Sequence, residues 1–186
     1  DETTICKFRH LLEAHQLGPQ ILAAVNAHLA EQGFKVSTGT IVDATIISAP
    51  SSTKNRDKQR DPEMHQTRKG KQWYFGMKAH IGVDSKTKMI HSIAATVANA
   101  HDSRVLEDLL HGEETRVWGN CAYTGQKQVI RESTPNARDF TQPKGRRHRQ
   151  LSETERSRNR NKSRVQAKVE HLFHVLKRQL GFAKVR

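Results

Sequence analysis

The hydrophobic positions of this 186-residue chain follow two periods, one typical of helices and one typical of strands. Near the N-terminus, apolar residues recur every three or four positions, which predicts two helices with a break at Gly18-Pro19 and an end near Gly33. Residues 38–50 are instead rich in β-branched side chains, which favour a buried strand. We therefore expect a helical N-terminal segment over residues 1–36, followed by a domain over residues 37–186 that begins with this strand.

The helical pair is compatible with two roles. It either reads DNA as a helix-turn-helix or packs against the domain that follows it. The few basic residues on these helices favour packing over direct contact with phosphate.

The rest of the chain alternates between strand and helix patterns. Residues 51–71 are polar and predict a mobile loop, whereas residues 72–98 predict a hairpin in which the aromatic run 73–75 packs within the strand. We then expect a helix over 101–111, a short strand from residue 116 and a helix over about 126–132. A long helix follows, beginning at Ser152 and Glu155, which have the spacing of a capping box.

Three polar residues at defined places in these elements are candidates for chemistry. Asp43 interrupts the apolar strand, where a carboxylate is costly unless it is ion-paired, hydrogen-bonded or bound to a cation. Asn120 follows a strand, where an α/β fold exposes functional side chains, although an Asn beside Gly also forms turns. Glu170 lies on the long helix and is either functional or a solvated acid paired with His174, while Asp102 is expected to be an N-cap.

The charge of the chain indicates its partner. The net charge is +13 and the pI is about 10.1, with basic residues concentrated in 51–71 and 144–164, a balance typical of nucleic-acid-binding proteins. Such binding would be sensitive to salt. No apolar run approaches the roughly 20 residues of a membrane span, and Cys6 and Cys121 lack the spacing of a zinc site or disulfide framework. These features are typical of a cytoplasmic protein with no membrane partner.

Five segments in order along the chain resemble the successive blocks of a bacterial insertion-sequence transposase of the DDE type. The resemblance extends over nearly the whole chain. The blocks are Thr-Gly-Thr-Ile-Val-Asp-Ala-Thr (38–45), Trp-Tyr-Phe-Gly-Met-Lys-Ala-His-Ile-Gly-Val-Asp (73–84), Asn-Ala-His-Asp-Ser (99–103), Val-Trp-Gly-Asn-Cys-Ala-Tyr-Thr-Gly (117–125) and Val-Glu-His-Leu-Phe-His-Val-Leu-Lys-Arg (169–178).

The resemblance implies an α/β fold of the ribonuclease-H-like class, a mixed sheet flanked by helices, and a site with two Mg²⁺ ions. Its implied reaction is DNA strand cleavage and transfer, and its implied partner is DNA, at the element's terminal inverted repeats, bound by a homo-oligomer associated with the bacterial nucleoid. Asp43 and Glu170 match the first and last catalytic acids, and Asn120 stands at the position of the second. The side chains expected to contact DNA are Lys78, His80, Arg164, Lys177 and Arg178.

The chain departs from the family pattern in three ways. Asn120 replaces an acid and would be a weak Mg²⁺ ligand, so two-metal chemistry is expected to fall severely. Ser163 and Gln166 stand where the family usually carries an aromatic residue and an Arg. Members of the family also have an N-terminal DNA-binding region, so this chain is expected to be a truncated copy. The alternative to an active transposase is therefore a decayed copy that only binds DNA.

Overall fold

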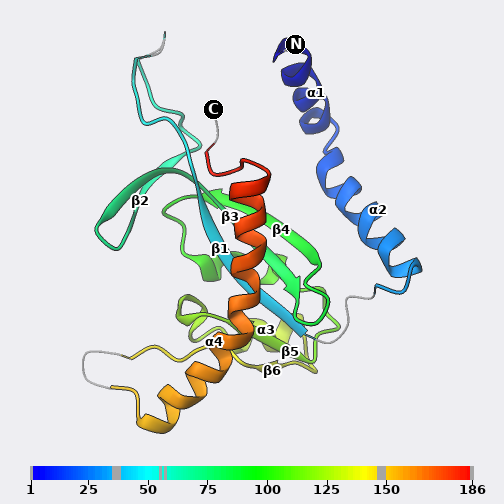
Figure 1. The fold of residues 1–186 in the computed structure, drawn as a ribbon, viewed down its shortest axis with the longest axis vertical. Helices are drawn as coiled ribbons and strands as arrows, with labels where there is room; N and C mark the ends of the chain where they lie inside the picture. Colours follow the sequence, from blue (N-terminus) through cyan, green and yellow to red (C-terminus); the bar gives the residue numbers. More distant parts are fainter. Residues whose placement is uncertain (1, 35–38, 55, 57, 146–149, 185–186) are drawn as a thin grey trace. The chain divides into compact units, whose positions relative to one another are not determined.

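The computed structural model describes residues 2–34, 39–54, 56, 58–145 and 150–184. They form two compact units, Asp1–Val36 and Ser37–Arg186 (Figure 1). The expected boundary at residues 36 and 37 lies outside the described residues, as do Arg146, Arg147 and Arg149 of the basic segment.

The described part of the N-terminal unit, residues 2–34, consists of two helices, α1 (Glu2–Ala14) and α2 (Leu17–Glu31), as the periodicity predicts. The break between them lies at Gln16, whose φ is +48°, rather than at Gly18-Pro19. Pro19 is tolerated in the first turn of α2 because backbone N–H groups there have no partner within the helix. Neither helix buries its apolar face within this unit, since Phe8 is 59% exposed and Val25 is 49% exposed.

Among the described residues, the larger unit is built on a mixed sheet of six strands. Its order is β2-β3-β1-β5-β6, with β4 also paired to β3. The central strand β1 is antiparallel to β3 and parallel to β5. The strands are β1 (Gly39–Ser48), β2 (His65–Lys69), β3 (Gln72–Asp84), β4 (Ile90–Val97), β5 (Arg116–Gly119) and β6 (Arg138–Asp139).

Successive residues of β1 point to opposite sides of the sheet. Each face packs against other elements of the unit. Ile41 packs with Val169 and Phe173 of the long helix α4 (Glu153–His174), which crosses one face of the sheet (Figure 1). Val42 packs on the other face, in a cluster completed by Leu106, Leu109, Tyr123 and Ile130. The capping box predicted at Ser152 and Glu155 is confirmed at the start of α4.

Three expectations for the elements between these strands differ from the structure. The polar segment 51–71 contains the edge strand β2, because Arg68 pairs with Trp73 and Lys69 pairs with Gln72 of β3. The expected helix over 101–111 is replaced by two short 3₁₀ turns, η1 (Asp102–Val105) and η2 (Glu107–Leu109). The two-residue strand β6 was not expected, whereas α3 (Lys127–Ser133) lies close to its predicted place.

None of the described helices has the length and apolar character needed to cross a bilayer.

Candidate active site

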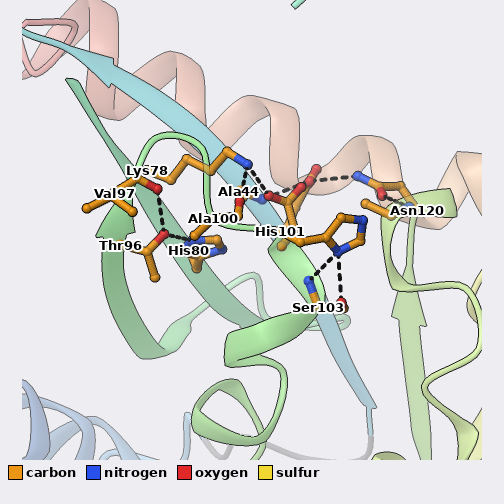
Figure 2. Close-up of polar contacts among 12 residues, drawn as sticks. Ala44, Lys78, His80, Thr96, Val97, Ala100, His101, Ser103 and Asn120 are labelled. Carbon is orange, nitrogen blue, oxygen red and sulfur yellow. Dashed lines mark hydrogen bonds and ion pairs between the residues drawn. The ribbon is translucent and has the colours of Figure 1, made fainter. Parts of the chain in front are cut away.

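The register of β1 against β5 brings Asp43 and Asn120 together. Val42 pairs with Gly119 in the parallel ladder, so the next residue of each strand lies at the same edge. The Asn120 Nδ2 donates to Asp43 Oδ1 at 3.0 Å, while Asn120 Oδ1 accepts from the Ala122 backbone N–H at 2.7 Å (Figure 2). Both ends of the Asn120 amide are therefore occupied within the protein.

Asp43, Asn120 and Glu170 line one open cavity of about 280 Å³. Strand β1 supplies Asp43, the residue after β5 supplies Asn120 and helix α4 supplies Glu170. The other residues that line the cavity include polar, charged and apolar side chains. They comprise Ala44, Thr45, Ile46, Thr67, Arg68, Lys69, Lys78 and Asp102.

The Asp43 carboxyl group is only 7% exposed, and its burial raises its pKa from 3.8 to about 6. Hydrogen bonds from the Ala44 backbone N–H and the Gln166 side chain oppose this rise. The negative charges of Glu170 and Asp102 reinforce it. A buried carboxylate close to other acids is a position where a cation or a proton is favoured.

Asp102 is a cavity residue for which the sequence predicts a different role. It was expected to be an N-cap, but the N-cap of η1 is His101, whose ring accepts from the Ser103 backbone N–H. The Asp102 carboxylate instead accepts from Lys78 Nζ at 2.7 Å, and Lys78 also donates to the Ala100 carbonyl oxygen at 2.7 Å (Figure 2). The expectation for Asp102 was wrong, because a cation 24 residues away outweighs the local capping preference.

His80 does not reach the surface, so its expected contact with DNA is wrong in this structure. Its side chain is 0% exposed, and Nε2 lies 2.8 Å from Thr96 Oγ1 (Figure 2). Burial also lowers the pKa of the His80 imidazole, which favours the neutral ring. A fully buried side chain does not reach a phosphate backbone.

Lys177 lies beside the cavity on a π-helical turn, η4 (Val175–Gln179), that continues α4. Its Nζ donates to the Ile46 carbonyl oxygen of β1 at 2.8 Å. Its pKa is lowered by partial burial and then by the nearby charge of Lys69. Lys177 and Lys69 thus bring two positive charges close together at the edge of the cavity.

Two further residues expected to contact DNA lie on α4 and on the η4 turn that continues it. Arg164 on α4 and Arg178 on η4 are exposed. Gln166, between them in sequence, is buried and donates to the Val42 carbonyl oxygen at 3.0 Å. It therefore joins α4 to β1 rather than facing solvent.

The donor set does not fit a two-metal centre as it stands. Among the described residues, no three His, Cys, Asp or Glu side chains form a group that would hold a metal ion. Asn120 donates an N–H to Asp43, whereas a carboxylate at position 120 would need a cation between it and Asp43. The Asn120 side-chain oxygen already accepts a hydrogen bond from the Ala122 backbone N–H. The amide therefore takes the place of a cation beside Asp43.

Replacing Asp43 with Asn is expected to stabilise the fold at neutral pH. Because the native state raises the pKa of this carboxyl, it holds a proton that the unfolded chain has already lost between about pH 4 and 6. The free energy of unfolding therefore falls as the pH rises through that window. Above about pH 6 the folded protein bears the full cost of burying the charged Asp43 carboxylate. The substituted amide would keep an oxygen for Ala44 and Asn120 without this penalty, a gain of roughly 2–3 kcal/mol at about pH 7.5.

Urea unfolding in EDTA measures this effect. The difference between Asp43→Asn and the parent should shrink toward pH 4, and the exposed substitution Asp108→Asn serves as the matched control. A variant less stable than the parent at neutral pH would show that the Asp43 charge is compensated in the folded state.

Comparison with known proteins assigns this fold to a family. The model of the transposase DDE domain matches residues 35–186, which is most of the chain. No solved structure matches it. Together, the family match and the mixed sheet flanked by helices confirm the expected ribonuclease-H-like α/β fold class.

Proposed function

Because this chain belongs to the transposase DDE domain family, we propose that it is the core of a bacterial insertion-sequence transposase. Its substrate is DNA, and its reaction class is the cleavage and transfer of strands at the element's ends. The observation that supports this proposal is the cavity lined by Asp43, Asn120 and Glu170, the three residues that the sequence resemblance matches to the family's catalytic positions.

The charges around the cavity support a phosphodiester substrate. Acidic side chains, Asp43, Asp102 and Glu170, lie in its walls, and the cations Arg68 and Lys69 lie beside them. Positive groups attract the DNA backbone, whereas Asp43 and Glu170 are the carboxylates available to a reacting phosphate, because Asp102 is paired with Lys78.

Members of this family generally use a divalent metal ion, commonly Mg²⁺. Asp43 and Glu170 are the residues of this chain that would hold it, and the ion would supply compensation for charge that develops on phosphate oxygens. The amide of Asn120 leaves that set incomplete. We therefore infer that cleavage is weak in the chain as it stands.

This incompleteness favours a second candidate function, DNA binding without cleavage. The specific observation is the hydrogen bond from Asn120 Nδ2 to Asp43 Oδ1, which gives the buried carboxylate a protein donor as a partner. In this role the chain binds the terminal inverted repeats, as a homo-oligomer, within the bacterial cytoplasm and on the nucleoid.

Both candidates require DNA binding, which titration with an end duplex tests directly. We expect the affinity to fall roughly 100-fold or more between about 50 and 200 mM salt, because each neutralised phosphate contributes a slope of about −0.9. Replacing both Arg164 and Arg178 with Ala should reduce that slope by roughly 2. Arg131→Ala, an exposed Arg on α3, is the control and should leave it unchanged.

A second titration, with a scrambled duplex of the same base composition, tests whether the inverted repeat is the preferred substrate. Tighter binding to the duplex that carries the inverted repeat supports the proposal. A salt-independent affinity, or no binding at low salt, would contradict it.

A further inference from the structure

The hairpin of β2 and the first part of β3, residues 65–76, is a basic projection of the sheet. Residues 64–83 contain no Asp or Glu. Within the hairpin, Arg68 pairs with Trp73 and Lys69 pairs with Gln72 across a turn of two residues, Gly70-Lys71. Three cations are therefore gathered close to its tip, Arg68, Lys69 and Lys71, all exposed.

Trp73 on this hairpin is 59% exposed, which corrects the expectation that the aromatic run packs within the strand. Only Phe75 of that run is buried. The Arg68 guanidinium lies 5.8 Å from the centroid of the Trp73 ring. By contrast Trp118, the other Trp of the chain, is 8% exposed and stacks on Phe140. The Trp73 ring is therefore held in the open beside an Arg, where it offers a face on which another planar group can stack.

The hairpin adjoins the cavity that contains Asp43. Thr67, Arg68 and Lys69 of β2 line that cavity. The Arg68 side chain thus contacts the Trp73 ring and also borders the cavity, so a nucleotide on the ring would have its phosphate close to the carboxylates.

The junction of the hairpin with the sheet is tightly fitted. Gly76, the last residue of the hairpin, has φ of +152°, and a side chain there would collide with the Ile47 carbonyl oxygen of β1. The absence of a Cβ lets β3 approach β1 closely at this point. Because β1 also carries Asp43, the position of the hairpin is tied to that of the candidate site.

We propose that this hairpin binds an unpaired nucleotide at a DNA end, with its base stacked on Trp73 and its phosphate held by Arg68 and Lys69. The proposal rests on the proposed function and specifies how the DNA end reaches the same site. An unpaired base is required because bases inside a duplex stack on one another and offer no free face to a side chain. Stacking of this kind accepts any base, so it positions an end without reading its sequence.

Tryptophan fluorescence tests the proposal with the protein as it exists. One duplex carries an unpaired 3′ overhang, and a blunt duplex has the same paired sequence. The overhang should quench the emission of exposed Trp73, and the variant Trp73→Phe, which retains only buried Trp118, should show no such quenching. Trp73→Ala should bind the overhang duplex roughly 5- to 100-fold more weakly while binding the blunt duplex within about twofold of the parent.

Two further variants complete the test. Trp73→Phe should recover much of the affinity lost in Trp73→Ala, because a phenyl ring still offers a stacking face. Ile93→Ala, which removes a 56% exposed side chain from β4, should leave both affinities unchanged.

The outcomes separate this proposal from the proposed function. Equal loss of affinity for both duplexes, or no loss for either, would overturn base stacking at Trp73 while DNA binding by the chain stands. Failure of the parent to bind either duplex at low salt would overturn both.

Discussion

Replacing Asn120 with Asp is expected to make the folded state respond to a divalent metal ion and to raise strand cleavage by roughly 100- to 1000-fold. In the parent, Asn120 Nδ2 donates to Asp43 Oδ1 at 3.0 Å. A carboxylate in that place replaces a donor with an acceptor, so two acidic oxygens would face each other at close range. Such a pair retains a proton or binds a cation.

Thermal unfolding gives the first readout, because it needs no DNA. In EDTA the Asn120→Asp variant should melt below the parent, and millimolar Mg²⁺ or Mn²⁺ should raise its melting temperature, since a ligand that binds only the folded state stabilises it increasingly as the ligand concentration rises. The parent should show little change. Cleavage of an end duplex in the same buffers gives the second readout.

Asn120→Ala is the matched control for this substitution. It removes the amide without adding charge, so it should lose stability in EDTA and gain nothing from the metal. If Asn120→Asp melts at the same temperature with and without Mg²⁺, position 120 is not the place of the second acid.

Replacing Glu114 with Ala is expected to destabilise the fold by roughly 3–5 kcal/mol. Glu114 is 0% exposed and accepts hydrogen bonds from the Thr40 hydroxyl at 3.0 Å and the backbone N–H groups of His111 and Gly112 at 2.8 and 2.9 Å. Alanine would leave these donors without their acceptor in the interior. Thr40 lies near the start of the strand that carries Asp43, so the loss should also loosen the candidate site.

Urea unfolding measures this cost. Glu114→Gln keeps one acceptor oxygen and most of the packing, so it should be affected less than Glu114→Ala. Glu113→Ala, at the exposed neighbouring position, should be close to neutral. A loss below about 1 kcal/mol in Glu114→Ala would mean that water replaces the carboxylate.

The elements with strong local signals were predicted from the sequence. The β-branched run around Asp43 indicated strand β1, and the capping box of Ser152 and Glu155 indicated where α4 begins. Strand β2 was missed because its side chains are polar. It is a strand because its backbone pairs with β3, and its composition does not favour that conformation. Propensity alone does not detect an edge strand of that kind.

The candidate site was predicted in part, because its residues come from separate elements. Alternation placed Lys78 and His80 on the same face of β3 but did not indicate that His80 is covered completely. Asp102 was missed because its partner Lys78 is distant in sequence, and capping rules consider only neighbours. The assignments of Asp43, Asn120 and Glu170 came from the family resemblance, and their catalytic roles stay predictions that the substitutions above test.

The hydrogen bond between Asn120 and Asp43 also has a genetic consequence. Codons for asparagine and aspartate differ only in their first base, so one A-to-G transition exchanges the amide for an acid. Because the amide keeps the two strand ends joined, a gene with this codon would encode a folded protein in which the rest of the site is retained. On our proposal, an insertion sequence that carries this codon lacks one catalytic acid, and a single point mutation would restore that acid.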